Sequence, residues 1–229
     1  MSSLRRAAGG LLRRLAPRSV NRWFWELRGR AYAEQAMSPA YRAMYEELAR
    51  LCLEPKPRAV LEIGCGYGYL LKRVYETGGK ILGARHFGVD LAEAQVRGAR
   101  RHFPQGKFFA HDLNRPLAGF ADAQFDVVAG VSVLMYLNEA GARGALRELR
   151  RVCGRRLVLA EQSVKHLDDA GRRDFDKVRG YDGRHPHDFE ALLKDAGFSR
   201  VEVRRIEPFF DPALNAAGEM PQTLFLADV

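Results

Sequence analysis

Three glycines and an acidic residue stand where a small molecule could meet the backbone closely. Gly64, Gly66 and Gly68 alternate directly after Glu62 and the apolar residues 59–63. Glycine has no side chain to keep a ligand away, and the N–H groups at the start of a following helix can bind a carboxylate. The GxGxG spacing differs from the GxGxxG turn of dinucleotide-binding proteins, so a nicotinamide cofactor is disfavoured.

Two aspartates follow the next two apolar stretches of the chain. Asp90 lies at the end of the second stretch and Asp112 at the end of the third. A carboxylate in the first of these positions can accept hydrogen bonds from both hydroxyls of a ribose. Each feature alone also fits a structural role, the glycines as a tight turn and the aspartates as helix-start or turn residues. Because three such features coincide at successive strand ends, we expect a site for a nucleoside-containing cofactor.

The apolar pattern predicts alternating strands and helices around these residues. Ser38 and Pro39 are typical of a helix start, and apolar residues then recur at helical spacing up to Leu51. We expect further helices over residues 70–75, ended by Gly78-Gly79, and over 92–101, 138–152 and 186–196. We expect strands over residues 59–63, 86–91, 107–113, 125–134, 156–161, 201–206 and 223–226.

This alternation is typical of an α/β protein, in which helices cover both faces of a doubly wound, mostly parallel sheet. The last two strands have no helix between them, so we expect them to form an antiparallel pair at the sheet edge. Residues 162–185 and 207–222 remain as loops or an insertion. Long loops in compact domains often cover a substrate.

These stretches resemble the class I, Rossmann-like methyltransferases that use S-adenosylmethionine (SAM). The matching text is VLEIGCGYG, GVDLAEAQV, FFAHDL, FDVVAGVSVL and FEALLKDAGFSRVEV, and the likeness runs from about Ser38 to the C-terminus. The resemblance implies a seven-stranded, mostly parallel, doubly wound sheet with an antiparallel last strand. It also implies a methyltransferase domain over residues 38–229, with SAM as the methyl donor.

The resemblance implies a place for each part of the cofactor. Glu62 would lie near the methionyl amino group, Asp90 would bind the ribose hydroxyls, and Asp112 would face the adenine amino group. The glycine turn would line the methionyl tail. The cofactor-binding residues implied in this way are Glu62, Gly64, Cys65, Gly66, Gly68, Asp90, Leu91, Asp112, Leu113 and Val131.

The acceptor side matches the family less closely. Many relatives carry a small hydroxyl residue at the position of Tyr67, and a histidine shortly after the fourth strand, where this chain has Leu134-Met135-Tyr136. Nothing in the sequence matches the Asn-Pro-Pro-Tyr signature of enzymes that methylate amino groups of nucleic acids and glutamine. The paired acidic metal ligands of the catechol type are also missing. We therefore expect a small-molecule, lipid-linked or glycan-type acceptor, whose identity stays open.

Methyl transfer from a sulfonium requires an aligned acceptor, and it requires a base only if the acceptor loses a proton. His185, His187 and Tyr136 are the candidates for that base. The alternative for the two histidines is structural, as a cap on the helix expected from Pro186. We expect no metal site, because His185 and His187 have no further spaced ligands.

The charge of the chain is concentrated at its N-terminus. The formal net charge is +9, but residues 1–30 hold eight arginines against one glutamate, which leaves 29 basic and 27 acidic residues elsewhere. A near-neutral body is not typical of a protein that binds nucleic acid, so that class of substrate is disfavoured. Two other functions stay open: a non-catalytic subunit with a SAM-binding fold and, less favoured, an NAD-dependent oxidoreductase.

Residues 1–37 are expected to form an extension that is either flexible or a lid on the domain. Leucines among arginines, followed by Trp23, Phe24 and Trp25, also fit peripheral membrane contact through residues 1–30, and transit peptides share this composition. The cysteines number three and include no CxxC pair, which indicates a reducing, cytoplasmic setting. No stretch reaches the ~20 apolar residues of a membrane span. The sequence indicates no oligomeric state.

Overall fold

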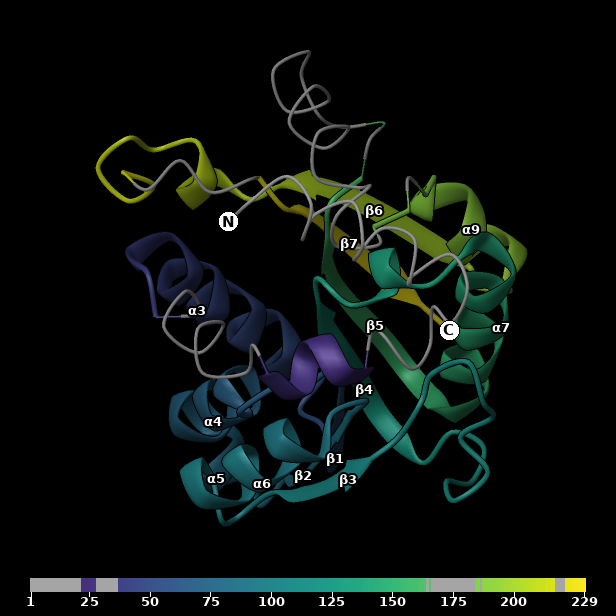
Figure 1. Ribbon diagram of the computed structural model, residues 1–229, viewed down its shortest axis with the longest axis horizontal. Helices are drawn as coiled ribbons and strands as arrows, with labels where there is room; N and C mark the ends of the chain where they lie inside the picture. The colour runs from purple at the N-terminus through teal and green to yellow at the C-terminus, as the bar shows by residue number, and fades with distance from the viewer. Residues whose placement is uncertain (1–21, 28–36, 164, 166–183, 186, 217–220) are drawn as a thin grey trace.

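One seven-stranded sheet organises the described part of the chain. The computed structural model describes residues 22–27, 37–163, 165, 184–185, 187–216 and 221–229. The strand order is β3-β2-β1-β4-β5-β7-β6, and β7 is antiparallel to both of its neighbours while all other pairs are parallel (Figure 1). The predicted α/β class and antiparallel last strand are therefore confirmed. The strands are β1 (Ala59–Ile63), β2 (Arg85–Asp90), β3 (Lys107–Ala110), β4 (Phe125–Val131), β5 (Cys153–Glu161), β6 (Arg200–Arg205) and β7 (Thr223–Asp228).

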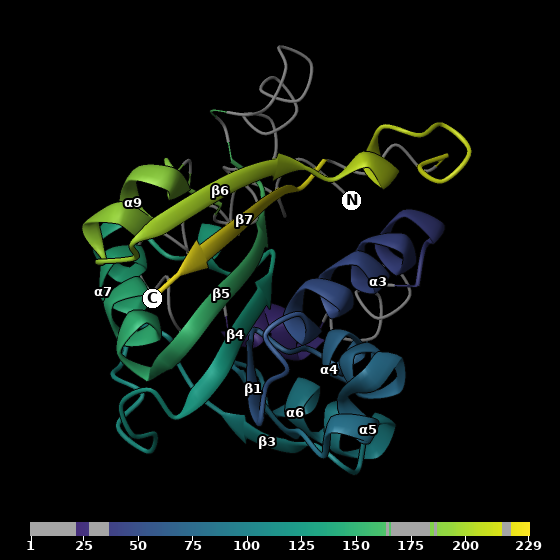
Figure 2. The same ribbon diagram turned by 180° about the vertical axis from the view of Figure 1, so that it is seen from behind.

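Helices cover both faces of this sheet (Figures 1 and 2). One face carries α3 (Pro39–Leu53), α4 (Tyr69–Val74), α5 (Lys80–Leu82) and α6 (Glu93–His102), and the other carries α7 (Glu139–Val152) and α9 (Phe189–Asp195). Successive residues of a strand point to opposite faces. Val127 and Val128 of β4 accordingly belong to two separate buried clusters, one beneath α3 and one beneath α7. Burial of both faces explains the nearly continuous apolar sequence of β4.

The helix α3 begins where the sequence predicts. The Ser38 hydroxyl oxygen accepts a hydrogen bond from the N–H of Tyr41 at 3.4 Å, and Pro39 occupies the first helical position. This cap supplies a partner for one of the N–H groups that every helix start leaves free. Met44 and Leu48 on the inner side of α3 are fully buried. The helix therefore closes one face of the sheet beside α4.

The helix after β1 breaks at Gly78-Gly79, where the sequence predicts its end. A turn of π-helix, η1 (Tyr75–Gly79), follows α4, and Gly78 within it has non-helical backbone, with a φ of 178° and a ψ of −16°. A short helix, α5, follows this kink and ends at Gly83, where φ is +65°. Gly79 also serves close packing, because a Cβ there would lie 2.8 Å from Nε2 of His86. The glycine pair therefore ends the regular helix and gives room to a side chain of β2.

Two strands end earlier than predicted. β3 ends at Ala110 instead of residue 113, because the Asp112 carboxylate accepts a hydrogen bond from Asn114 N at 3.0 Å and turns the chain. β4 ends at Val131 instead of residue 134, because Ser132 has a φ of +51°, which lies outside the range of a strand. Neither turn has a signal in the apolar pattern.

The helix predicted from residue 186 begins at Phe189. The Asp188 side chain caps it by accepting a hydrogen bond from the N–H of Ala191 at 3.1 Å. The strand predicted from residue 156 begins earlier, at Cys153, directly after α7. These shifts move the boundaries and leave the order of the elements as predicted.

The expected N-terminal extension is described only over residues 22–27, which form a short helix. The first of the two predicted loops, 162–185, falls almost entirely outside the described residues. The second, 207–222, includes a 3-10 turn, η4 (Glu207–Phe209), and Phe209 of this turn packs on Tyr41. Within the described ranges, no helix is long and apolar enough to cross a membrane.

Candidate active site

Three parallel strands end side by side at one edge of the sheet. Ile63 of β1 is paired with Val89 of β2 on one side and with Gly130 of β4 on the other. Parallel strands share a carboxyl edge, which is where open α/β sheets bind their ligands. The glycine turn after β1, Asp90 at the end of β2 and Val131 at the end of β4 are therefore neighbours.

The glycine turn is closely packed from behind. Gly64, Gly66 and Gly68 all have positive φ, a conformation that strains other residues. A Cβ on Gly64 would lie only 2.5 Å from the side chain of Val133. The N–H of Cys65 donates to the backbone of β2 at 3.0 Å, while its side chain is buried in the core. The turn therefore offers backbone, and no side chain, to a ligand at the sheet edge.

The Asp90 carboxylate ties the end of β2 to this turn. Its Oδ2 accepts a hydrogen bond from Gly66 N, and its Oδ1 accepts one from Ala92 N, both at 2.9 Å. Burial raises the pKa of Asp90 to about 6. The two backbone hydrogen bonds lower this pKa, whereas the nearby Glu26 carboxylate raises it further. A carboxylate has about four acceptor sites, so the group can also accept hydrogen bonds from a ligand.

Glu62 is a buried carboxyl group behind the glycine turn. Its exposed fraction is 4%, and its Oε2 accepts a hydrogen bond from Leu71 N of α4 at 3.4 Å. Burial raises the pKa of Glu62 well above its ordinary value; the Leu71 bond opposes the rise and the Asp90 charge adds to it. A nearby cation would favour the ionised form. The group is therefore suited to a cationic partner such as an ammonium.

Asp112 lies in a turn beside the end of β2. Its Oδ1 accepts hydrogen bonds from N and Nδ2 of Asn114 at 3.0 and 2.8 Å. The preceding residue, His111, donates its N–H to the carbonyl of Asp90 at 2.8 Å. Leu113 packs against the buried cluster beneath α7. The structure thus brings the two aspartates of the sequence pattern together along one edge.

Gln95 is a buried polar residue at this edge that the sequence analysis missed. It lies near the start of α6 with an exposed fraction of 2%, and its Oε1 has no hydrogen-bond partner in the described part of the chain. A Cβ on Gly66 would lie 3.7 Å from this oxygen. Leaving a buried acceptor without a partner is unfavourable. The arrangement therefore indicates that a ligand supplies the donor.

The Tyr67 side chain lies against α6 and does not face the sheet edge. A Cβ on Gly98 of α6 would collide with the Tyr67 ring. The ring also stacks on that of Tyr69, with the centroids 6.4 Å apart. A large residue is therefore accommodated in the turn because α6 has a glycine opposite it.

The segment after β4 forms a second part of the site. It contains a 3-10 turn, η2 (Leu134–Tyr136), whose backbone is held by Glu161 at the end of β5. Oε1 of Glu161 accepts hydrogen bonds from Val133 N and Leu134 N at 2.9 and 2.8 Å, and Oε2 accepts one from Met135 N at 3.4 Å. Burial raises the pKa of Glu161 to about 7 against these bonds. Glu161 is therefore a positioning residue for η2.

The two candidate histidines are brought to this same turn. His185 donates its backbone N–H to the carbonyl of Met135 at 2.7 Å, and Nε2 of His187 lies 2.8 Å from the carbonyl of Leu137. A carbonyl only accepts, so the contact places the proton of neutral His187 on Nε2. Burial lowers the pKa of both rings. His187 thus has a structural contact, whereas the His185 ring makes no hydrogen bond within the described residues.

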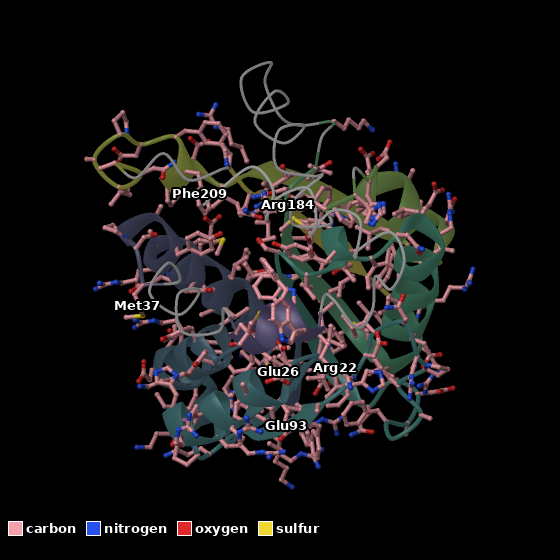
Figure 3. The ribbon with its side chains drawn as sticks, in the orientation of Figure 1. Arg22, Glu26, Met37, Glu93, Arg184 and Phe209 are labelled. Carbon is pink, nitrogen blue, oxygen red and sulfur yellow. The ribbon has the colours of Figure 1, made fainter. Side chains whose placement is uncertain are left out.

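The helix of residues 22–27 joins both parts of the site (Figure 3). Figure 3 shows Glu26 beside Glu93 at the start of α6, where the Glu26 carboxylate accepts two backbone hydrogen bonds at 2.7 and 3.0 Å. The ring of Trp25 meets that of Tyr136 edge to face, with the centroids 5.1 Å apart. Tyr136, the third candidate base, is therefore packed against this helix.

Comparison with known proteins relates part of the chain to the methyltransferases. Residues 60–155 match the family model of the methyltransferase domain, and this stretch holds the glycine turn, both aspartates and the turn after β4. This stretch of the chain therefore carries a methyltransferase domain. The fold around it is shared with SAM-dependent methyltransferases, among them proteins solved with S-adenosylhomocysteine or sinefungin bound. A search of the curated proteins found no match to the sequence.

The methyltransferase domain shares its fold with many solved structures. A SAM-dependent methyltransferase from Thermotoga maritima, named as a possible histamine N-methyltransferase, is 19% identical with a TM-score of 0.64, over 89% of this chain and 97% of that one. The magnesium protoporphyrin IX methyltransferase of Synechocystis is 17% identical with a TM-score of 0.66, over 92% and 98%. Geranyl diphosphate methyltransferase is 15% identical with a TM-score of 0.62, over 82% and 78%. At sequence identities this low, the similarity between these proteins and the chain is one of fold and does not extend to substrate.

The residues of this methyltransferase site fit SAM. The glycine turn offers bare backbone, Glu62 and Asp90 offer carboxylates, and Oε1 of Gln95 is a buried acceptor without a partner in the described chain. These groups suit a molecule with an ammonium, a ribose and a net positive charge. No cluster of three or more His, Cys, Asp or Glu side chains that could hold a metal ion lies within the described ranges.

Two further residues of the site were not singled out from the sequence. Gln95 stands among apolar residues of α6 that face the core, such as Val96 and Ala99, and a polar residue in that position is a usable signal. Ser132 has a positive φ at the end of β4 and donates its hydroxyl to Oε1 of Gln222 at 2.9 Å. A serine gives no such signal, because its type does not predict left-handed backbone.

Proposed function

We propose that this methyltransferase transfers a methyl group from SAM to a small-molecule acceptor by in-line displacement. The observation that carries the proposal is the cover over η2, the turn after β4. Residues 22–27 contact it through Trp25, and the segment before α9 contacts it through His185 and His187. Ligand sites for small molecules are concave and largely enclosed. A turn covered in this way suits a small molecule better than the surface of a macromolecule.

In the proposed complex, the ribose and the ammonium group of SAM each meet a described carboxylate. Asp90 accepts hydrogen bonds from the ribose hydroxyls, and Glu62 pairs with the ammonium group. The contact between Gly66 and Asp90 supports this assignment, because it holds the carboxylate at the glycine turn. The remaining cofactor residues are assigned as the family resemblance implies, namely Gly64, Cys65 and Gly68 to the methionyl tail, Leu91 beside the ribose, Asp112 and Leu113 to the adenine and Val131 to the pocket wall.

When bound, SAM supplies a methyl group on a positively charged sulfur, which leaves as a neutral thioether. The protein has to align the acceptor and to keep water away from it. Glu161 contributes by fixing the backbone of η2. If the acceptor is a hydroxyl, His185 takes its proton, because burial holds the pKa of this ring below its ordinary value and leaves it neutral near pH 7.

The solved neighbours support the small-molecule class without deciding the compound. Two of their names contain magnesium protoporphyrin IX and geranyl diphosphate, and a third describes a possible histamine N-methyltransferase. The near-neutral composition outside residues 1–30 disfavours a nucleic acid acceptor. A lipid-linked or glycan-type acceptor remains within the proposal, because its reacting end can enter the same site.

The test is to incubate the full-length protein with methyl-labelled SAM and a cell extract, and then to separate low-mass, lipid, protein and nucleic acid fractions. We expect label in the low-mass or lipid fraction, and none with the Asp90→Ala variant. Label confined to protein or nucleic acid would overturn the small-molecule proposal. Failure of the protein to bind SAM in calorimetry would overturn the assignment of the cofactor residues.

The role of His185 is tested in the same assay. We expect the His185→Ala variant to bind SAM as the unmodified protein does, and to form labelled product at least about a hundredfold more slowly. An unchanged rate would show that the acceptor gives no proton to this ring. The His185→Gln variant separates a role as a base from a role in packing, because glutamine keeps roughly the size of the side chain and loses the basic nitrogen.

A further inference from the structure

We propose that the helix of residues 22–27 is a component of the SAM site, and that its docking and the binding of SAM stabilise each other. The inference rests on the proposed function, since it takes SAM to bind against both Asp90 and the glycine turn. The matched family segment covers residues 60–155 only, so the helix lies outside it. Two independent contacts fasten the helix, one at each part of the site.

The first contact caps α6. Oε1 of Glu26 accepts a hydrogen bond from Glu93 N at 2.7 Å, and Oε2 accepts one from Ala94 N at 3.0 Å. The residue at the capping position of α6 itself is Ala92, which has no side-chain oxygen for this purpose. The first N–H groups of a helix need partners. The carboxylate from the N-terminal segment therefore completes α6 at the point where the chain leaves Asp90.

The second contact, made by the residue next to Glu26, fastens the helix to the acceptor side. The Trp25 ring meets Tyr136 of η2 edge to face at 5.1 Å, with an angle of 81° between the planes. Such aromatic pairs are attractive beyond their buried area. Two adjacent side chains of the helix therefore reach the ribose side of the site, at α6, and the acceptor side, at η2.

The charges and contacts favour a helix that adds to the cofactor site over one that blocks it. Glu26 uses the N–H groups of Glu93 and Ala94, whereas Asp90 uses those of Gly66 and Ala92, so the two carboxylates do not compete for donors. SAM is a cation, and an added carboxylate near Asp90 attracts it. By linkage, docking of the helix raises the affinity for SAM by the same factor by which bound SAM favours docking.

The tryptophans provide a direct readout, because the only two in the chain, Trp23 and Trp25, both lie in this helix. Trp23 is exposed, with 65% of its surface accessible. In the Trp23→Phe variant, fluorescence therefore reports on Trp25 alone. We expect Trp25 emission to change on titration with SAM or S-adenosylhomocysteine, and to reach half of its full change at the dissociation constant that calorimetry gives.

A substitution at Glu26 tests the coupling. We expect Glu26→Ala to weaken SAM binding about five- to tenfold in calorimetry and to shrink the Trp25 signal, and Glu26→Gln to lie between, since it keeps one acceptor oxygen. The matched control is Leu27→Ala in the same helix, whose side chain is 64% exposed. It should leave both readouts unchanged.

The outcomes separate this inference from the proposed function. If SAM binds normally but Trp25 emission does not change and Glu26→Ala binds as tightly as the unmodified protein, the helix is no part of the site. Tighter binding by Glu26→Ala would show a helix that blocks the cofactor, and would overturn the inference as well. Absence of SAM binding in the unmodified protein would instead contradict the assignment of the cofactor residues itself.

Discussion

Gly66 donates its backbone N–H to Oδ2 of Asp90 over 2.9 Å, although Gly66 lies in the turn after β1 and Asp90 ends β2. The bond fixes the middle of the glycine turn against the end of β2. The glycine turn and the aspartate after the second strand, which the sequence identifies separately, are therefore joined by a hydrogen bond. A ligand that binds one of them necessarily lies against the other.

Replacing Asp90 should remove SAM binding and leave the fold in place. We expect Asp90→Ala to raise the dissociation constant of SAM by about a hundredfold or more, because hydrogen bonds to a charged group contribute roughly 1.5–3 kcal/mol each. The measurement is calorimetry, with circular dichroism to show that the variant is folded. The control is Asp126→Ala: Asp126 also accepts two backbone hydrogen bonds, from Arg58 N and Ala59 N at 2.7 and 3.2 Å, but near the start of β1. Equal losses of affinity in both variants would contradict the ribose assignment.

The affinity for SAM should depend on pH through the carboxyl groups of the site. The pKa of Asp90 is about 6 and that of Glu62 is raised, so both hold protons near neutral pH more often than ordinary carboxyl groups. A cationic ligand favours their ionised forms, so binding should release protons and should strengthen as pH rises from about 5 to above 6. Calorimetry in buffers of different ionisation enthalpy measures this release. A profile in which affinity falls with rising pH over that range would contradict the prediction.

The sequence predicts those parts of the fold that local patterns determine. The helix cap at Ser38, the glycine turn after β1 and the aspartate at the end of β2 are all where the pattern places them. Each depends on residues that are close together in the chain. The predicted end of β4 at residue 134 is wrong for a different reason, because the strand stops at the positive φ of Ser132, which the residue type does not indicate.

The unpredicted parts of the site depend on contacts between distant residues. Glu161 is joined to the turn after β4 across more than twenty positions, and Glu26 to the start of α6 across more than sixty. No local pattern identifies such pairs, because a buried glutamate and an exposed one have the same sequence signal. This is also why Trp23, Phe24 and Trp25 alone could not distinguish a lid from a membrane-binding segment.

Gln95 offers a test in which affinity and stability move in different directions. Removing an unpaired buried oxygen from the free protein should leave its stability unchanged or raise it by about 1 kcal/mol. If that oxygen accepts a hydrogen bond from SAM, Gln95→Leu should still weaken SAM binding several-fold. Urea denaturation and calorimetry measure the two effects. The control variant is His86→Leu, because Nε2 of His86 is also buried without a partner in the described chain. This atom lies against Gly79 of the π-turn, away from the glycine turn, so the substitution should change the stability and leave the affinity for SAM unchanged.

Glu161 should make the stability of the free protein depend on pH. Its pKa is raised from 4.5 to about 7 in the fold, so the folded state holds this proton more tightly than the unfolded chain does. Its contribution is therefore fully present below pH 4.5 and is lost as pH rises through about 7. For a shift of this size the loss is on the order of 3 kcal/mol. Urea denaturation at pH 5 and pH 8 measures the difference.

The Glu161→Gln variant identifies the source of that dependence. Glutamine can keep the two hydrogen bonds that Oε1 accepts from Val133 and Leu134, but it cannot titrate. We expect the variant to lose most of the difference in stability between pH 5 and pH 8. Asp90→Asn should reduce the difference by a smaller amount, because its pKa rises only to about 6. If Glu161→Gln retains the full pH dependence, the buried carboxyl group responsible lies elsewhere, and Glu62 becomes the residue to replace next, since its pKa is raised by burial as well.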